Sequence, residues 1–210
     1  MHRTRLGLVL LALAFSGCGG GDEPPITPEV RAASLRFAPE VGDAERQWVL
    51  AAIDQARPEA RRLIDDVDGM VTVTTWQNRN DLAVGLMTTS GNGAYTVSLN
   101  LAFLNADRKI DRNTAVLHEL GHVIDHALVP PELRDQLAAS LPPVGACATT
   151  LTGDCTAPEE RFADTFAKWA LRGAVSVAGA GYGVATPASL EDWGAPLSAL
   201  AIEIAVAAGR

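Results

Sequence analysis

Two histidines and a glutamate that could act together on one ion lie in the sequence HELGH at positions 118–122. On a helix, His118 and His122 lie on the same face one turn apart, so both imidazoles can reach a single zinc ion. Zinc lowers the pKa of a bound water towards neutrality, and Glu119 can accept the proton as that water attacks a carbonyl. Gly121 leaves room for another element to pack against this helix. The motif therefore predicts zinc-dependent hydrolysis with Glu119 as the general base.

A third zinc ligand has to come from outside this motif, because a catalytic zinc site usually has three protein ligands and one water. His126 lies eight residues after His118, about 12 Å along a straight helix, so the two cannot share an ion unless the helix breaks. Metzincins use a glycine turn and a later histidine, but Asp125 and Leu128 occupy the corresponding positions. His126 is therefore interpreted as a residue behind the ligands or on the surface.

An acidic pair further along the chain offers the better third ligand. Glu160 and Asp164 are four residues apart, so they share one face of the helix predicted for this region. Glu160 can bind zinc, and Asp164 can accept the second N–H of a ligating histidine and fix its tautomer. Glu159 is a competing ligand, but the residue four positions after it is an alanine. An ordinary helix start, where acidic residues are favoured, is the other explanation for the pair.

The two motifs together resemble the gluzincin group of zinc metallopeptidases. HELGHVID and ERFADTFA are similar to the catalytic domain of the anthrax lethal factor type and to the compact minigluzincins. The resemblance covers residues 111–170 and implies a zincin-like fold, a zinc cofactor and a peptide or protein substrate. On this pattern Glu160 matches the third ligand and Asp164 the acid behind it.

The resemblance implies two further parts of the site. The strand upstream of the active-site helix lines the cleft and pairs with extended substrate, which assigns this role to Thr96–Phe103. Gluzincins also have a tyrosine or histidine near the oxyanion. Tyr182 is the candidate for that role, with Tyr95 and His126 as weaker alternatives, and none of them matches the pattern by position.

The N-terminus has the layout of an export signal, with basic residues followed by an apolar run of ten residues that ends at Phe15. Small residues before Cys18 resemble the lipobox of bacterial lipoproteins, although Phe15 stands where leucine is usual. We predict a signal peptide at 1–17, a lipidated cysteine and flexible tether at 18–35, and a single zincin-like domain at 36–210. The protein would then be exported and membrane-anchored, facing the periplasm or the cell exterior. A plain signal peptide with a chance cysteine is the alternative.

The two remaining cysteines, Cys147 and Cys155, form an even pair that encloses seven residues. In an oxidising compartment such a pair is expected to close a disulfide. A pair of metal thiolates is the alternative, although no further cysteine exists to complete such a set.

The formal net charge of −8, without a basic cluster, argues against nucleic-acid binding. The expected partners are a peptide or protein substrate and a membrane, through the N-terminal lipid, and the expected state is a monomer. A second hypothesis from a different class is a surface-anchored lipoprotein that binds a partner and carries a structural or vestigial zinc site.

The elements that must hold these residues follow from apolar periodicity. It predicts helices at 43–66 with a break at Pro58, and at 111–126, 130–141, 158–171 and 189–208. Alternating residues predict strands at 70–76 and 95–103, with a turn at 90–93. Charges within the last helix argue against a membrane span. The order predicts an α+β fold, in which a small mixed sheet packs on the active-site helix and a mostly helical C-terminal half follows.

Overall fold

The computed structural model describes residues 35–81, 83–105, 111–143, 157–174 and 184–209. Several predictions lie outside these residues and stay predictions. They are the signal peptide, most of the tether with Cys18, the disulfide between Cys147 and Cys155, and the oxyanion role of Tyr182.

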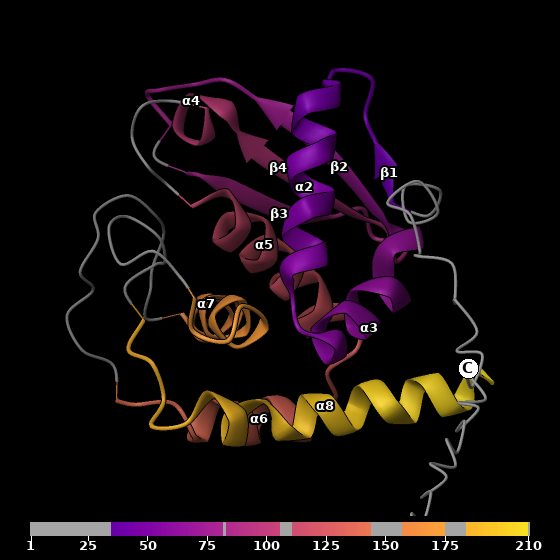
Figure 1. Ribbon diagram of the computed structural model, residues 1–210, viewed down its shortest axis with the longest axis vertical. Helices are drawn as coiled ribbons and strands as arrows, with labels where there is room; N and C mark the ends of the chain where they lie inside the picture. The colour runs from indigo at the N-terminus through magenta and orange to yellow at the C-terminus, as the bar shows by residue number, and fades with distance from the viewer. Residues whose placement is uncertain (1–34, 82, 106–110, 144–156, 175–183, 210) are drawn as a thin grey trace, which may run out of the picture.

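A four-stranded mixed sheet lies at one end of the molecule (Figure 1). Its strands are β1 (Arg36–Phe37), β2 (Val71–Trp76), β3 (Gly85–Thr89) and β4 (Tyr95–Asn100), in the order β1-β2-β4-β3. The first, second and fourth strands are parallel, and β3 runs antiparallel to β4 at the edge. Alternate residues of β2 are buried because successive side chains of a strand point to opposite faces.

Helices pack around a long central helix, α5 (Arg112–Ala127), which contacts β3 and β4 and also α2, α3 and α7. The other helices are α2 (Asp43–Gln55), α3 (Pro58–Val67), the short α4 (Leu101–Leu104), α6 (Pro131–Ala139), α7 (Pro158–Ala170) and α8 (Leu190–Ala207), with a 3-10 turn, η1 (Asp68–Met70). In Figure 1, α8 crosses the end of the molecule opposite the sheet. The described residues therefore form an α+β fold with a small mixed sheet, as predicted.

Local sequence accounts for the bounds of these helices. Pro58 stands at the first position of α3, so the predicted helix 43–66 is divided into α2 and α3, with extended backbone at Ala56. Asp111 caps α5 by accepting hydrogen bonds from the backbone N–H groups of Asn113 and Thr114. The glycines of the predicted turn at 90–93 have φ of 71° and 77°, which other residues rarely adopt.

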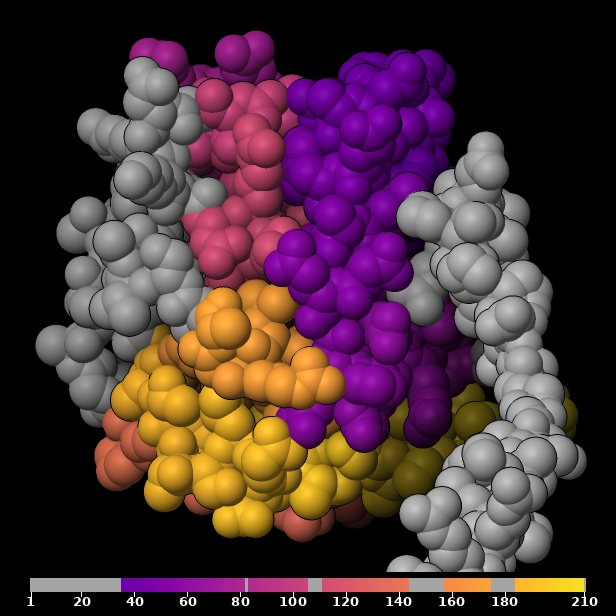
Figure 2. Space-filling model, in the orientation of Figure 1, coloured from indigo at the N-terminus to yellow at the C-terminus, as the bar shows by residue number. Residues whose placement is uncertain are grey.

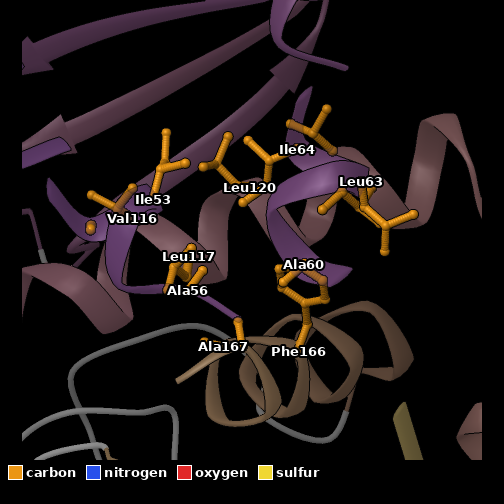
Figure 3. Close-up of a cluster of buried hydrophobic side chains, with 14 of the residues drawn as sticks. Ile53, Ala56, Ala60, Leu63, Ile64, Val116, Leu117, Leu120, Phe166 and Ala167 are labelled. Atoms are coloured by element: carbon orange, nitrogen blue, oxygen red, sulfur yellow. The ribbon is translucent and has the colours of Figure 1, made fainter. Parts of the chain in front are cut away.

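The hydrophobic core lies between the sheet and the helices and is centred on α5. Residues 114–125 of this helix are all buried, so α5 has no solvent face over three turns. Figure 3 shows part of the core, where side chains of α2 and α3 meet those of α5 and α7. Its labelled residues are Ile53, Ala56, Ala60, Leu63, Ile64, Val116, Leu117, Leu120, Phe166 and Ala167.

The structure differs from the prediction in the sheet. The strand predicted at 95–103 ends at Asn100, because the side chain of Asn100 accepts a hydrogen bond from the N–H of Ala102 and starts α4. Two strands were not predicted: β1 has only two residues, and β3 lies in the segment 77–89, for which the sequence predicts no element. Among the described residues, no helix is long and apolar enough to cross a membrane.

Candidate metal centre

The central helix supplies two ligand side chains from its buried interior. His118 is fully buried and His122 nearly so, at 0% and 8% exposure. Because they are one turn apart on α5, their Nε2 atoms lie 3.1 Å from each other. Burial of two imidazoles among apolar side chains is unfavourable unless their nitrogens form hydrogen bonds or bind a metal ion. The two histidines therefore need a polar group beside them.

The partner carboxylate comes from the first turn of α7. Glu160 Oε2 lies 3.1 Å from His118 Nε2, and Glu160 Oε1 lies 3.6 Å from His122 Nε2. Gly121 permits this approach, because a Cβ there would lie 3.1 Å from the Cα of Ala163 and 3.2 Å from the ring of Phe166. The close contact between α5 and α7 thus brings together groups that are about forty residues apart in the sequence.

The donor set fits a zinc ion in both chemistry and spacing. Possible ligand atoms of His118, His122 and Glu160 all lie within 4.8 Å of one another. In a tetrahedral site with bonds of about 2.0–2.1 Å, neighbouring ligand atoms are about 3.3 Å apart, close to the observed separations. Two imidazoles and one carboxylate are also the ligand set of many catalytic zinc sites.

The electrostatics of the cluster favour metal binding at neutral pH. Burial lowers the pKa of His118 to about 4, although its hydrogen bond to Glu160 opposes the change. Burial would also lower the pKa of His122, but Glu160 and the charges of Glu119 and Asp125 outweigh it and the pKa is raised. Burial opposes ionisation of Glu160, yet the two histidines lower its pKa to about 2. His118 is therefore neutral and Glu160 ionised at neutral pH, as metal ligands must be, and the acidic groups that raise the pKa of His122 would also attract a cation.

No family model, curated protein or solved structure matches this chain. The function of the protein is therefore inferred from the residues of the site and from the sequence.

The predicted general base is buried beside the ligands. Glu119 is 2% exposed, and its negative charge acts on His122. Its side chain lies against the backbone of β3 at Gly85, where an added Cβ would be 2.6 Å from its Cδ and 2.7 Å from its Cγ. The helix thus presents a carboxylate next to the metal-ligand cluster, at the beginning of the edge strand.

Behind the ligands lies an ion pair of which the sequence predicted one half. Asp164 is completely buried, and its negative charge opposes the fall in the pKa of His118 that burial causes. Its Oδ2 accepts a 2.6 Å hydrogen bond from Lys168 Nζ, which also donates to the carbonyl of Val184. The role of Lys168 was not predicted, although residues four apart on a helix can form an ion pair, and Lys168 lies four residues after Asp164.

Other candidates from the sequence lie away from the cluster. Glu159 and His126 are exposed. Tyr95 is buried at the start of β4, four residues or about 13 Å along the strand from Leu99, which pairs with Gly85 beside Glu119. Among the described residues, neither weaker oxyanion candidate therefore lies with the metal ligands.

The prediction that the strand Thr96–Phe103 pairs with an extended substrate was wrong. Residues 96–100 belong to β4, which has β2 on one side and β3 on the other, so its backbone groups are already paired. In the described sheet, β3 forms one edge and the two-residue strand β1 forms the other. Of these two edges, β3 is the one that begins beside Glu119. The sequence could not identify this edge, because strand order depends on pairing between distant segments.

Proposed function

We propose that this protein is a zinc-dependent peptidase that acts outside the cytoplasm. The observation that carries the proposal is the convergence of His118, His122 and Glu160 beside the buried carboxylate of Glu119. A purely structural zinc site has no need for a carboxylate that does not bind the metal.

Each of these residues has a role in the proposed reaction. The three ligands would hold zinc, which supplies an activated water and polarises the scissile carbonyl. Glu119 takes the proton from the attacking water and delivers it to the leaving nitrogen. Asp164, paired with Lys168, supports the orientation of His118 from behind. The burial of the cluster strengthens these electrostatic effects, because water screens them less.

The open edge of β3 supports an extended peptide as the substrate. Asn100 N–H donates to the carbonyl of Val84, and Ser90 N–H donates to that of Ala94, which fixes the hydrogen-bonded pairs between β3 and β4. Because such pairs alternate in an antiparallel ladder, the intervening residues direct their N–H and C=O groups away from β4. These residues are Gly85, Met87 and Thr89. An extended peptide can add to this edge by main-chain hydrogen bonds, next to Glu119.

Export is the second part of the proposal and rests on the N-terminal sequence. The basic and apolar segment before Cys18 supports cleavage of a signal peptide and lipidation of this cysteine. A lipid at Cys18 would anchor the domain to a membrane through a short tether rich in glycine and proline.

The experiment that tests the activity compares zinc-loaded wild type with Glu119→Gln. Wild type should cleave a mixed peptide library, and Glu119→Gln should retain one zinc per chain but lose cleavage by about 10²-fold or more, because the amide cannot accept the proton. Cleavage products are read by mass spectrometry, and zinc by elemental analysis.

Two results would contradict the proposal. Undiminished cleavage by Glu119→Gln would show that this carboxylate is not the base. Zinc bound to wild type without cleavage of any peptide would favour the alternative, a surface lipoprotein that binds a partner and uses zinc structurally.

A further inference from the structure

We propose that Gly85 is a positioning residue, which sets the place of the Glu119 carboxylate because it has no side chain. This inference rests on the proposed function, in which Glu119 is the general base. Gly85 is the first residue of β3, and a Cβ at this position would overlap the side chain of Glu119, at 2.6 Å from Cδ and 2.7 Å from Cγ. Such distances are far shorter than the normal contact of two carbon atoms, about 3.5–4.0 Å.

The strand cannot move away from Glu119 to make room for a side chain. Gly85 pairs with Leu99 in the interior strand β4, and the adjacent carbonyl of Val84 accepts a hydrogen bond from Asn100 N–H. The buried Asn100 side chain also donates to the carbonyls of Asn78 and Ala83, which lie just before β3. The beginning of β3 is therefore fixed from β4 and from the preceding loop.

The helix cannot move away either. Residues 119 and 121 point about 200° apart around a helix, so Gly121 lies nearly opposite Glu119. On that opposite side, Gly121 already packs against α7, where an added Cβ would lie 3.1 Å from the Cα of Ala163. The central helix is thus held between β3 and α7, and Glu119 is the group that has to move if position 85 gains a methyl group.

A methyl group at position 85 is expected to displace the carboxylate while the fold persists. Gly85 lies in a regular strand and its φ is not positive, so alanine can adopt the same backbone. The three atoms nearest to the added Cβ all belong to Glu119 and none to His118, His122 or Glu160, so we expect zinc to bind as before. The added methyl group should therefore affect only proton transfer by Glu119. Misplacement of a catalytic group by about 1 Å can lower the reaction rate by about 10²-fold.

The test compares Gly85→Ala with Gly69→Ala, a matched control in which the added Cβ meets no atom within 4 Å. With zinc-loaded protein and one peptide cleaved by wild type, Gly85→Ala should lower kcat by about 10²-fold and leave KM and zinc affinity unchanged. Gly69→Ala should match wild type in all three quantities. A kcat of Gly85→Ala within about twofold of wild type would overturn the inference.

A double-mutant cycle separates positioning from a general disturbance of the site. Glu119→Ala removes Cγ and Cδ, the carbon atoms that the added Cβ would overlap, so adding Gly85→Ala to this variant should reduce its residual kcat by less than about threefold. An equal loss in both backgrounds would mean that position 85 does not act through Glu119.

A crystal structure of zinc-loaded Gly85→Ala tests the contact without any activity assay. The carboxylate of Glu119 should be shifted relative to wild type, with β3 and α5 unmoved. An unshifted carboxylate overturns the inference whether or not cleavage is detected. Failure of the proposed peptidase function would be seen separately, because the wild-type protein would then cleave no peptide.

Discussion

Glu159 and Glu160 are adjacent in the sequence, but only the second lies beside the histidines. Both stand in the first turn of α7, where the helix dipole favours negative charge. Glu159 is exposed, whereas both carboxylate oxygens of Glu160 face the imidazoles of α5. A rotation of about 100° per residue around the helix separates a surface acid from a candidate ligand.

These neighbours provide a matched pair of variants. Glu160→Gln should weaken zinc binding by more than about 100-fold, since loss of a ligand exceeds the 10- to 100-fold typical of groups behind the ligands. Glu159→Gln removes the same charge from the same turn and should leave the affinity within about twofold. Zinc affinity is measured by competition with a chelator, and equal losses in both variants would argue for a general effect of charge.

At the scale of the elements, the beginning of β3 is the part of the sheet that bears on the site. It depends on Asn100, which is fully buried at the end of β4 and caps α4. The Oδ1 atom of Asn100 accepts from the N–H groups of Asn78 and Ala102, and Nδ2 donates to the carbonyls of Asn78 and Ala83. One side chain therefore joins a strand, a short helix and the loop before the edge strand.

Replacement of Asn100 by alanine should destabilise the protein strongly. The change removes four hydrogen bonds made by a fully buried side chain, and we expect the free energy of unfolding to fall by about 3 kcal/mol. Urea titration followed by circular dichroism measures the loss. Asn92→Ala, in the exposed turn before β4, is the control and should change the free energy by less than about 0.5 kcal/mol. A similar value for both variants would contradict this role.

At the scale of the whole molecule, the candidate metal centre joins two helices from distant parts of the chain. In Figure 2, α7 lies between α8 and the pair formed by α2 and α3, and the helix that carries Glu160 also packs against α5 and α6. The site is therefore formed only when the helices have assembled around α5. A metal ion bound there stabilises the folded state, because the unfolded chain lacks the site.

Zinc should accordingly raise the melting temperature of the protein. At a free zinc concentration of 100 times Kd, the stabilisation is about 2.7 kcal/mol, which for a chain of this size corresponds to about 5–10 °C. Differential scanning calorimetry with zinc or with EDTA measures the shift. The double variant His118→Ala, His122→Ala should show no zinc-dependent shift, and a shift of equal size in that variant would place the metal elsewhere.

The sequence by itself determined the helices that carry the site and the residues that they present. His118 and His122 share a face because of helix geometry alone, and the same holds for Glu160 and Asp164. Pro58 and Asp111 likewise set helix bounds through local backbone and capping effects. These features depend on residues within one or two turns, so the sequence contains what is needed to predict them.

Only the tertiary structure decided which strand forms the sheet edge beside Glu119 and which residue lies against the side chain of this proposed general base. Gly85 is 34 positions from Glu119, and nothing in its neighbourhood in the sequence connects the two. The contact follows from the register of β3 on β4 and from the packing of α5 against both the sheet and α7. Strand order and helix packing are set by the joint burial of segments far apart in the chain, and local patterns do not encode which segments meet.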